Sequence, residues 1–470
     1  MLANEKEIKR KYLGKSIRSF LELPDLIETQ LNSYKTFLSG IENDTSDSNE
    51  EIGLKDVFET TFPIESPTGD MRLEFRSYSL DYDSIKFTEL ECKQKGLSYA
   101  VPLKAEIDLV FTETHEIRRK EIYMGDIPLM TDRGTFIING AERVVVAQIH
   151  RSPGVIFSHD KGVYSSRIIP YRGTWLEFEI DQKNNLIFAK LDRKKKILAT
   201  MFLRALSFSS PDKDSEERIR IFDTREKIIE AFYKTRNVSI TKNMTENGSL
   251  TGSILAKDVF ITDEAGERKK LYQAGSKVHP HNIDEMCQLG IKEISIVDFE
   301  AEGSLDSPII INCFEREEMK YTPDPMAFDE PTFEDAISLV YQSLQPGNPM
   351  TIEDAAKDLE SLYFSTRRYD LGRVGRYKIN KKFDYSDDVA TSTLIASDIT
   401  STMKYLIEVF GGKNTIDDID HLGNRRIRAV GEFLTTTFKT AFSRMARIAS
   451  DRMSQKELDT LKPQDLISIK

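Results

Sequence analysis

The feature that most limits the possible folds is a change in the spacing of hydrophobic residues along the chain. Between residues 70 and 191, apolar residues gather in short β-branched runs bounded by turns, which predicts strands. Near the C-terminus they recur every three or four residues, which predicts amphipathic helices. At 470 residues the chain also exceeds what one hydrophobic core usually holds. The sequence therefore predicts a multidomain α+β protein with mixed sheets and helices.

The best-defined local element is a hairpin in the segment TFIINGAERVVVAQI, residues 135–149. Its Asn139-Gly140 dipeptide separates two β-branched runs. These two residues tolerate positive φ, which a two-residue turn between twisted strands requires. Two further strands are predicted at Trp175–Ile180 and Leu186–Leu191.

Three helices are predicted from apolar spacing. The first runs from Pro24 to Gly40, with proline at its start and glycine at its end. The second carries the stripe from Ile399 to Phe410 and ends at Gly411-Gly412, and the third runs from Ile427 to about Met453. After the first helix, the acidic segment NDTSDSNEE is typical of a solvated loop, and a sheet-like region is expected from about Leu54.

Two shorter segments between these elements are also interpretable. The window 250–300 contains short strands around a helix that is predicted to start near Asn282, and it is interpreted as a small inserted module. The acidic, proline-rich residues 321–335 are typical of a linker into further helices.

Composition narrows the class of protein. Hydrophobic residues make up 39% and charged residues 30%, and the mean hydropathy is -0.42, as in soluble globular proteins. No apolar run is long enough to cross a membrane, and the first 20 residues lack the apolar core of a signal peptide. We therefore expect a cytoplasmic protein with no membrane contact. Cys92, Cys287 and Cys313 lie too far apart to suggest a metal-ligand pair, so reduced structural thiols are expected.

Motifs of a self-contained active site are missing from the sequence. It has no GxxxxGK[ST] phosphate loop, no GxGxxG after a strand, no HExxH and no GxSxG. The six histidines are dispersed, and His279-Pro280-His281 is interpreted as a surface loop rather than a metal site. We therefore expect no catalytic residue, no cofactor and no metal site in this chain.

Basic residues are clustered although the net charge is -11. The clusters are Arg193–Lys196, Thr366–Lys382 with seven cations, and the arginines of DHLGNRRIRAVGE, residues 420–432. The last arginines stand at the apparent start of the long helix, where the helix dipole is already positive, so an anion or a guanine edge is expected there. The alternatives are a solvated turn for the first cluster and pairing with nearby acids for the third.

Trp175 is the only tryptophan, and it is either a core anchor or a platform for an unstacked base. In a strand, Trp175 shares a face with Glu177 and Glu179, which suggests a solvent-facing side. Arg143 and Arg151 bracket the apolar residues 144–149, and their spacing alone leaves their role undecided.

Three strings in this sequence resemble, in the same order, long signature strings of the bacterial RNA polymerase beta-subunit family. They are GTFIINGAERVVVAQIHRSPGVIF, RYDLGRVGRYKIN and DHLGNRRIRAVGE. Both ends of the chain also resemble the N-terminal portion of that family. The resemblance implies that a lobe domain, residues 146–425 with a variable insertion near 215–320, is inserted into a protrusion domain. The protrusion would comprise residues 1–145 and 426–470, the second part leading toward the fork region.

The same resemblance implies a subunit of DNA-directed RNA polymerase, a nucleotidyltransferase. This part would form one jaw of the DNA cleft and contact the non-template strand and downstream DNA. Magnesium for catalysis is expected on the beta-prime subunit. The implied partners are DNA and RNA, the alpha, beta-prime and omega subunits, sigma factor and the remainder of the beta subunit. The alternatives are a free nucleic-acid-binding module or an interaction scaffold outside polymerase.

Residue by residue, the resemblance implies positions near the non-template strand for Arg151, Trp175, Arg193, Asp420 and Arg425. Trp175 would stack on a base, and Asp420 with Arg425 would shape a guanine-accepting pocket. Further nucleic-acid contacts are expected in the second basic cluster at Arg373, Arg376 and Lys378. Arg143 and Val146 match the edge of the pocket where rifamycins bind.

Overall fold

The computed structural model describes residues 25–39, 53–112, 114–192, 194–206, 208–209, 218–240, 250–262, 268–321, 330–348, 351–385, 390–454 and 462–467. The chain forms two compact units: unit 1 is Met1–His150 with Ile427–Lys470, and unit 2 is Arg151–Arg426. Unit 2 is thus inserted into unit 1, and the predicted α+β class is confirmed. The chain passes between the units in β7 (Gln148–Arg151) and β19 (Arg425–Arg428), which pair as a two-stranded sheet.

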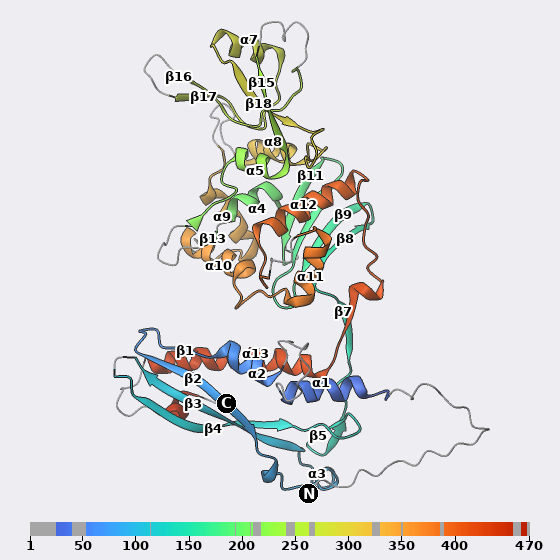
Figure 1. The fold of residues 1–470 in the computed structure, drawn as a ribbon, viewed down its shortest axis with the longest axis vertical. Helices are drawn as coiled ribbons and strands as arrows, with labels where there is room; N and C mark the ends of the chain where they lie inside the picture. The colour runs from blue at the N-terminus through green and yellow to red at the C-terminus, as the bar shows by residue number, and fades with distance from the viewer. Residues whose placement is uncertain are drawn as a thin grey trace, which may run out of the picture. The chain divides into compact units, whose positions relative to one another are not determined.

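Unit 1 is built on a four-stranded antiparallel sheet with helices against one face (Figure 1). The strands are, in order, β1 (Ile64–Glu65), β2 (Met71–Leu80), β3 (Ala100–Phe111) and β4 (Ile117–Pro128). The helices are α1 (Glu28–Ser39), α2 (Leu54–Thr61) and α13 (Val430–Met453). Alternate residues of β3 are buried, as the strand period of two requires, and they join one core with the apolar residues of these helices.

The predicted hairpin is confirmed in unit 1. Strands β5 (Phe136–Ile138) and β6 (Ala141–Arg143) pair through Asn139 and Gly140, whose φ angles are 49° and 77°. Gly140 packs against Gly96, which ends α3 (Glu89–Lys95); a Cβ on Gly140 would lie 2.8 Å from the Gly96 Cα. Helix α3 was not predicted from the sequence, although a capping box at Thr88 marks its start. Unit 1 also contains η1 (Tyr82–Ser84) and α14 (Pro463–Leu466).

Two predictions about unit 1 are wrong. Residues 54–61 form the helix α2 rather than the start of a sheet, because Leu54, Val57 and Phe58 bury one helical face. Helix α13 begins at Val430 rather than at Ile427, because residues 425–428 pair as a strand. The first predicted helix is confirmed from Glu28 to Ser39, whereas its expected ends and the acidic segment after it lie outside the described residues.

Unit 2 is built on a five-stranded antiparallel sheet in the order β12-β11-β10-β9-β8. Its strands are β8 (Gly154–Asp160), β9 (Val163–Ile169), β10 (Leu176–Asp181), β11 (Leu186–Leu191) and β12 (Lys196–Leu198). Both strands predicted for this region are confirmed as β10 and β11. The sheet ends at β8, so one edge of β8 is not covered by another strand of this sheet.

Helices of unit 2 share the hydrophobic core of this sheet. They are α4 (Ala199–Ala205), α5 (Arg225–Phe232), α8 (Ile309–Tyr321), α9 (Phe333–Leu344), α10 (Ile352–Phe364), α11 (Gly372–Lys382) and α12 (Ala396–Phe410). The predicted stop of α12 is confirmed, and Gly412 is its left-handed residue with φ 77°. The remaining short elements are β13 (Phe208–Ser209), β14 (Arg218–Ile219) and η2 (Leu422–Asn424).

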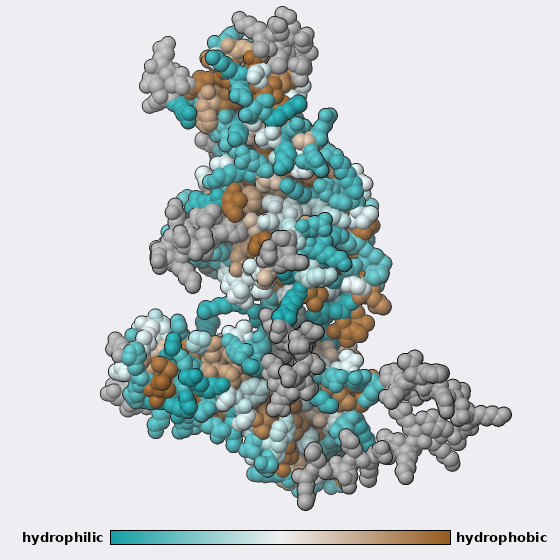
Figure 2. Space-filling view, in the orientation of Figure 1, coloured by the Kyte–Doolittle hydropathy of each residue, from teal (hydrophilic) through white to brown (hydrophobic). Residues whose placement is uncertain are grey.

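A small module within unit 2 has a hydrophobic core of its own. It comprises β15 (Lys234–Ser239), β16 (Val259–Thr262), β17 (Arg268–Tyr272), α7 (Pro280–Gln288) and β18 (Glu293–Asp298). Lys234 pairs with Asp298, so the chain enters and leaves the module at one place. The strands and the helix expected in this window are confirmed, and the helix starts at Pro280, two residues before Asn282. Figure 2 shows hydrophobic residues at the surface of this module, where Phe260 and Leu289 are exposed.

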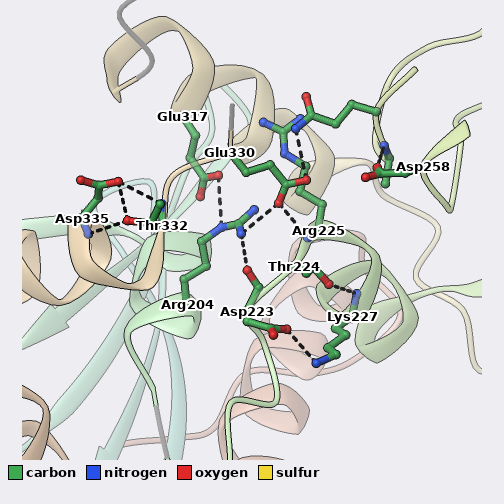
Figure 3. A network of polar contacts seen from close by, with 12 residues as sticks. Arg204, Asp223, Thr224, Arg225, Lys227, Asp258, Glu317, Glu330, Thr332 and Asp335 are labelled. Carbon is green, nitrogen blue, oxygen red and sulfur yellow. Dashed lines mark hydrogen bonds and ion pairs between the residues drawn. The ribbon is translucent and has the colours of Figure 1, made fainter. Parts of the chain in front are cut away.

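A buried ionic network joins several elements of unit 2 (Figure 3). Arg204 of α4 and Glu317 of α8 are buried, with Arg204 Nε 3.7 Å from Glu317 Oε2 and Arg204 Nη1 3.2 Å from Glu330 Oε2. Burial raises the pKa of Glu317 and outweighs the opposing effect of Arg204. Burial alone would also raise the pKa of Glu330, but Arg204, Arg225, Gln273 and Lys270 together lower it. The linker predicted at 321–335 is shorter than expected, because Tyr321 ends α8 and residues 333–335 begin α9; residues 322–329 lie outside the described part.

Candidate nucleic-acid interface

Segments of unit 2 that are far apart in the sequence meet at the open edge of β8. Helix α11 packs on β8 (Figure 1). The loop between α12 and β19 runs along the same edge, where the Asp417 N–H donates to the Phe157 carbonyl at 2.9 Å. The Ser152 N–H donates to the Asn424 carbonyl, also at 2.9 Å. Residues from all three strings that resemble the polymerase family therefore lie together in unit 2.

Two glycines allow α11 to approach the chain before β8. A Cβ on Gly375 would lie 3.0 Å from the Pro153 Cβ. Gly154 has a φ of 134°, and a Cβ there would lie 3.2 Å from the Lys378 Cβ. A larger side chain at either position would push α11 away from the strand, because protein interiors are close-packed.

Asp420 and Arg425, the two residues expected to shape a guanine-accepting pocket, lie side by side. Arg425 Nη1 is 3.9 Å from Asp420 Oδ1, and their side chains are 45% and 86% exposed. The Asp420 N–H donates to Asp418 Oδ1 at 2.9 Å, and Asn424 Nδ2 donates to the Asp418 carbonyl at 2.8 Å. An exposed carboxylate accepts hydrogen bonds and a guanidinium donates them, so this pair offers both kinds of group to a base edge.

The arginines of this third string do not stand at a helix N-terminus, contrary to the prediction. They lie in β19, and the first turn of α13 carries the acid Glu432, as the helix dipole favours. Arg428 Nε donates to Glu432 Oε1 at 2.9 Å, and Arg425 pairs with Asp420, so the alternative of acid pairing is confirmed for both arginines. The Arg426 guanidinium lies 5.5 Å from the centroid of the Tyr171 ring.

Several cations of the second cluster, Thr366–Lys382, are partnered within unit 2. Arg376 is buried and pairs with Asp398 through two hydrogen bonds of 3.0 and 2.9 Å. The expected nucleic-acid contact at Arg376 is therefore wrong, because its guanidinium is enclosed by protein. Lys378 Nζ donates to the Gly423 carbonyl at 2.6 Å, whereas Arg373 is exposed on α11.

Trp175 is half-buried just before β10, and its expected solvent-facing neighbours are not exposed. Glu177 and Glu179 are 6% and 8% exposed. Glu177 lies 3.6 Å from Arg167 Nε. Burial alone would raise the pKa of Glu179, but hydrogen bonds from Lys190 and Lys196 lower it. The face is therefore covered by ion pairs, and the solvent-facing prediction is wrong.

The first basic cluster, Arg193–Lys196, also finds partners inside unit 2. Lys196 pairs with Glu179, and Lys194 Nζ donates to the Leu344 carbonyl. Arg193 lies outside the described residues. The Asp192 N–H donates to the Trp175 carbonyl at 3.1 Å, so the loop after β11 meets the tryptophan.

The remaining predicted residues lie near the ends of unit 1 strands and of β7. Arg151 is half-buried at the end of β7, and Arg143 is exposed at the end of β6. Val146 is 75% exposed, and Val144 and Ile149 are exposed as well. Such an exposed apolar run is typical of a contact surface. The rifamycin pocket edge at Arg143 and Val146 stays a prediction.

No group of three or more His, Cys, Asp or Glu side chains within the described ranges is placed to hold a metal ion. None of the helices in those ranges is long and apolar enough to cross a membrane. Cys92, Cys287 and Cys313 are free, and burial raises the pKa of Cys313 to about 12.

The chain is similar to known proteins over its whole length. A family profile described as "RNA polymerase beta subunit" matches residues 25–133, and one described as "RNA polymerase Rpb2, domain 2" matches residues 310–428. The DNA-directed RNA polymerase subunit beta of Treponema denticola is 63% identical over 470 residues, which is 100% of this chain. The corresponding subunits of Treponema pallidum and Borrelia recurrentis are 59% and 48% identical over 98% of this chain. The chain spans 39% of the length of each of these relatives.

Proposed function

Because the chain belongs to the RNA polymerase beta-subunit family, we propose that it is the N-terminal part of that subunit and forms one jaw of the DNA cleft. In this role it contacts the non-template strand and downstream DNA. Unit 1 corresponds to the protrusion and unit 2 to the lobe. The observation that carries the proposal is the exposed Asp420–Arg425 pair, beside which the three signature strings converge.

The proposed assembly includes the alpha, beta-prime and omega subunits, sigma factor and the remainder of the beta subunit, in the cytoplasm. Nucleotidyl transfer and its magnesium ions belong to the assembled polymerase, with the ions on beta-prime. This chain contributes shape and nucleic-acid contact. Asp420 and Arg425 recognise a guanine of the non-template strand, Trp175 stacks on a neighbouring base, and Arg151, Arg193 and Arg373 contact the backbone.

The test is polymerase assembled from this chain, the remainder of the beta subunit and the alpha, beta-prime, omega and sigma subunits. The half-life of the promoter complex is compared between guanine and thymine at each non-template position of the bubble. We expect guanine to prolong the half-life about tenfold at one position, as one good base contact does. The double variant Asp420→Ala/Arg425→Ala is expected to lose most of this guanine effect.

The matched control is Lys277→Ala/Glu315→Ala, which removes an exposed pair of 2.9 Å elsewhere in unit 2. It should keep the guanine effect. Failure of the chain to assemble, or an unchanged guanine effect in the Asp420/Arg425 variant, contradicts the proposal. Tight, salt-sensitive DNA binding by the unassembled chain would favour the free nucleic-acid-binding module instead.

A further inference from the structure

We propose that Lys378 and Lys382 of α11 are positioning residues that hold the loop 417–423 at both ends and so present Asp420 beside Arg425. The inference rests on the proposed function of that pair. It also gives a different role to two lysines of the second basic cluster, of which Lys378 was expected to touch nucleic acid directly.

Lys382 holds the first end of the loop. Its Nζ lies 2.7 Å from Asp417 Oδ1, and both side chains are 23% exposed. The same ammonium lies over the rings of Phe157 and Tyr405, at 5.3 and 4.7 Å from their centroids. Two aromatic faces and one carboxylate therefore fix the position of this charge, and each attracts a cation.

Asp417 in turn is fixed to the open edge of β8. The Phe157 N–H donates to Asp417 Oδ2, and the Asp417 N–H donates to the Phe157 carbonyl, both at 2.9 Å. The loop thus satisfies the outward-facing N–H and carbonyl of Phe157 in an edge strand, which would otherwise face solvent. One carboxylate joins the loop, the sheet and α11.

Lys378 holds the second end of the loop. Its Nζ donates to the Gly423 carbonyl at 2.6 Å, and the Gly423 N–H donates to His421 Nδ1 at 3.0 Å. Lys378 and Lys382 are four residues apart on one helix, so they lie on the same face one turn apart. Their two contacts, at Asp417 and Gly423, lie three residues before and three residues after Asp420.

Helix α11 is a firm base for these two lysines. The buried Arg376, two residues before Lys378, fixes the helix to Asp398, and Gly375 allows it to pack on Pro153. Burial lowers the pKa of Lys378, as expected for an ammonium group drawn toward the protein rather than left in water. The amino groups of both lysines are thus turned to the loop. Without them, the loop would be held at its ends only by the hydrogen bonds between Asp417 and Phe157 and between Ser152 and Asn424, and the exposed Asp420 would lie on the span between these points.

The experiment uses the assembled polymerase and the guanine-to-thymine ratio of promoter-complex half-lives. Lys382→Met keeps the apolar stem against the two rings and removes the charge. We expect the ratio to fall at least about threefold, because the base contact is lost in part. Half-lives on the thymine template should change little. Lys382→Arg, which keeps the positive charge, should restore most of the ratio.

The matched control is Lys270→Met. Lys270 also pairs with a carboxylate, that of Asp258, which likewise accepts a backbone N–H, from Ala274 at 2.7 Å. Lys270 Nζ also lies 3.7 Å from Glu330 Oε1. Neither contact involves the loop 417–423, so loss of the Lys270 charge should leave the ratio unchanged. Asp417→Asn and Lys378→Met give two further variants. Both variants should lower the guanine-to-thymine ratio. They test the positioning role if polymerase with Lys382→Met does not assemble.

The outcomes separate this inference from the function on which it rests. If Asp420→Ala/Arg425→Ala abolishes the guanine effect but the lysine and Asp417 variants keep it, the positioning role is overturned and the proposed function stands. An equal loss of half-life on both templates in these variants also overturns it, because that is general structural damage. If no variant, including the double alanine, changes the ratio, the proposed function itself fails.

Discussion

The carboxylate of Asp108 illustrates what a single side chain does in unit 1. Asp108 has no exposed surface, and two arginines on the neighbouring strands donate to it. Arg119 does so through Nε at 2.8 Å and Nη2 at 3.1 Å, and Arg76 through Nε at 2.8 Å. The hydrogen bond from Arg119 lowers the pKa of Asp108 most, burial opposes it, and Arg76 adds to the lowering.

We predict that Asp108→Asn lowers the free energy of unfolding of unit 1 at neutral pH by about 1–2 kcal/mol. The expected effect is modest because the side chains of both arginines are about half exposed, so water screens their charges. The folded-state pKa lies below the ordinary value of 3.8, so the stabilisation is complete above about pH 3.8. It is lost as the pH falls through the folded-state pKa. Thermal unfolding of both proteins across this range is the measurement. A difference that stays constant down to the lowest pH would contradict the prediction.

Individual residues differ in how far the sequence determines their environment. Asn139 and Gly140 were predictable, because a two-residue turn depends on their own φ angles. Arg376 was not, because its partner Asp398 is 22 residues away and only the packing of α11 brings the two together. The alternation around Trp175 placed Glu177 and Glu179 on one face of the strand. The two-residue repeat of a strand does not show, however, whether other parts of the protein cover that face.

At the scale of elements, the buried network of Figure 3 joins α4, α8 and the segment before α9. Arg204 is 1% exposed and lies between Glu317 and Glu330, while the backbone N–H of Arg225 also donates to Glu330 at 3.3 Å. Such a network holds its elements in one arrangement, since each charge depends on its partners to offset desolvation.

We predict that Arg204→Met destabilises unit 2 by about 3–5 kcal/mol, because it removes the buried cation that lies between the buried Glu317 and the partly buried Glu330. Denaturant unfolding and amide exchange in α4 and α8 are the measurements. Lys277→Met, which breaks an exposed pair, should cost less than about 1 kcal/mol. Equal effects of the two substitutions would show that the network adds no more than a surface ion pair.

Helices and strands were predictable where their periodicity was clear and complete. The stripe of α12 and the runs of β10 and β11 are examples. Helix α2 was missed because eight residues are too few to separate helical from strand periodicity. Helix α13 starts later than expected because pairing with β7 extends Arg425–Arg428, a tertiary contact that the apolar spacing of Ile427 does not reveal.

For the whole molecule, the insertion of unit 2 means that unit 1 is assembled from two distant parts of the chain. Its core combines residues of the sheet with Val430, Phe442, Met445 and other residues of α13. Unit 2, in contrast, is one continuous segment, 151–426. The two units therefore depend differently on the C-terminal end of the sequence.

We predict that removing residues 427–470 unfolds unit 1 and leaves unit 2 folded, because only unit 1 loses part of its core. Amide exchange of the shortened chain is the measurement: β3 should lose its protection while β10 and β11 keep theirs. Protection of β3 that survives the truncation would show that α13 is dispensable for the sheet.

The pairing of Lys234 with Asp298 has a consequence for how such a gene can change over generations. Because the chain returns beside the point where it left, codons can be added or removed between these two positions while both flanking strand ends stay where they are. The cost of a longer loop grows only slowly with its length. Insertions, deletions and substitutions can therefore change the size and sequence of this module while the structure of the surrounding unit 2 is kept.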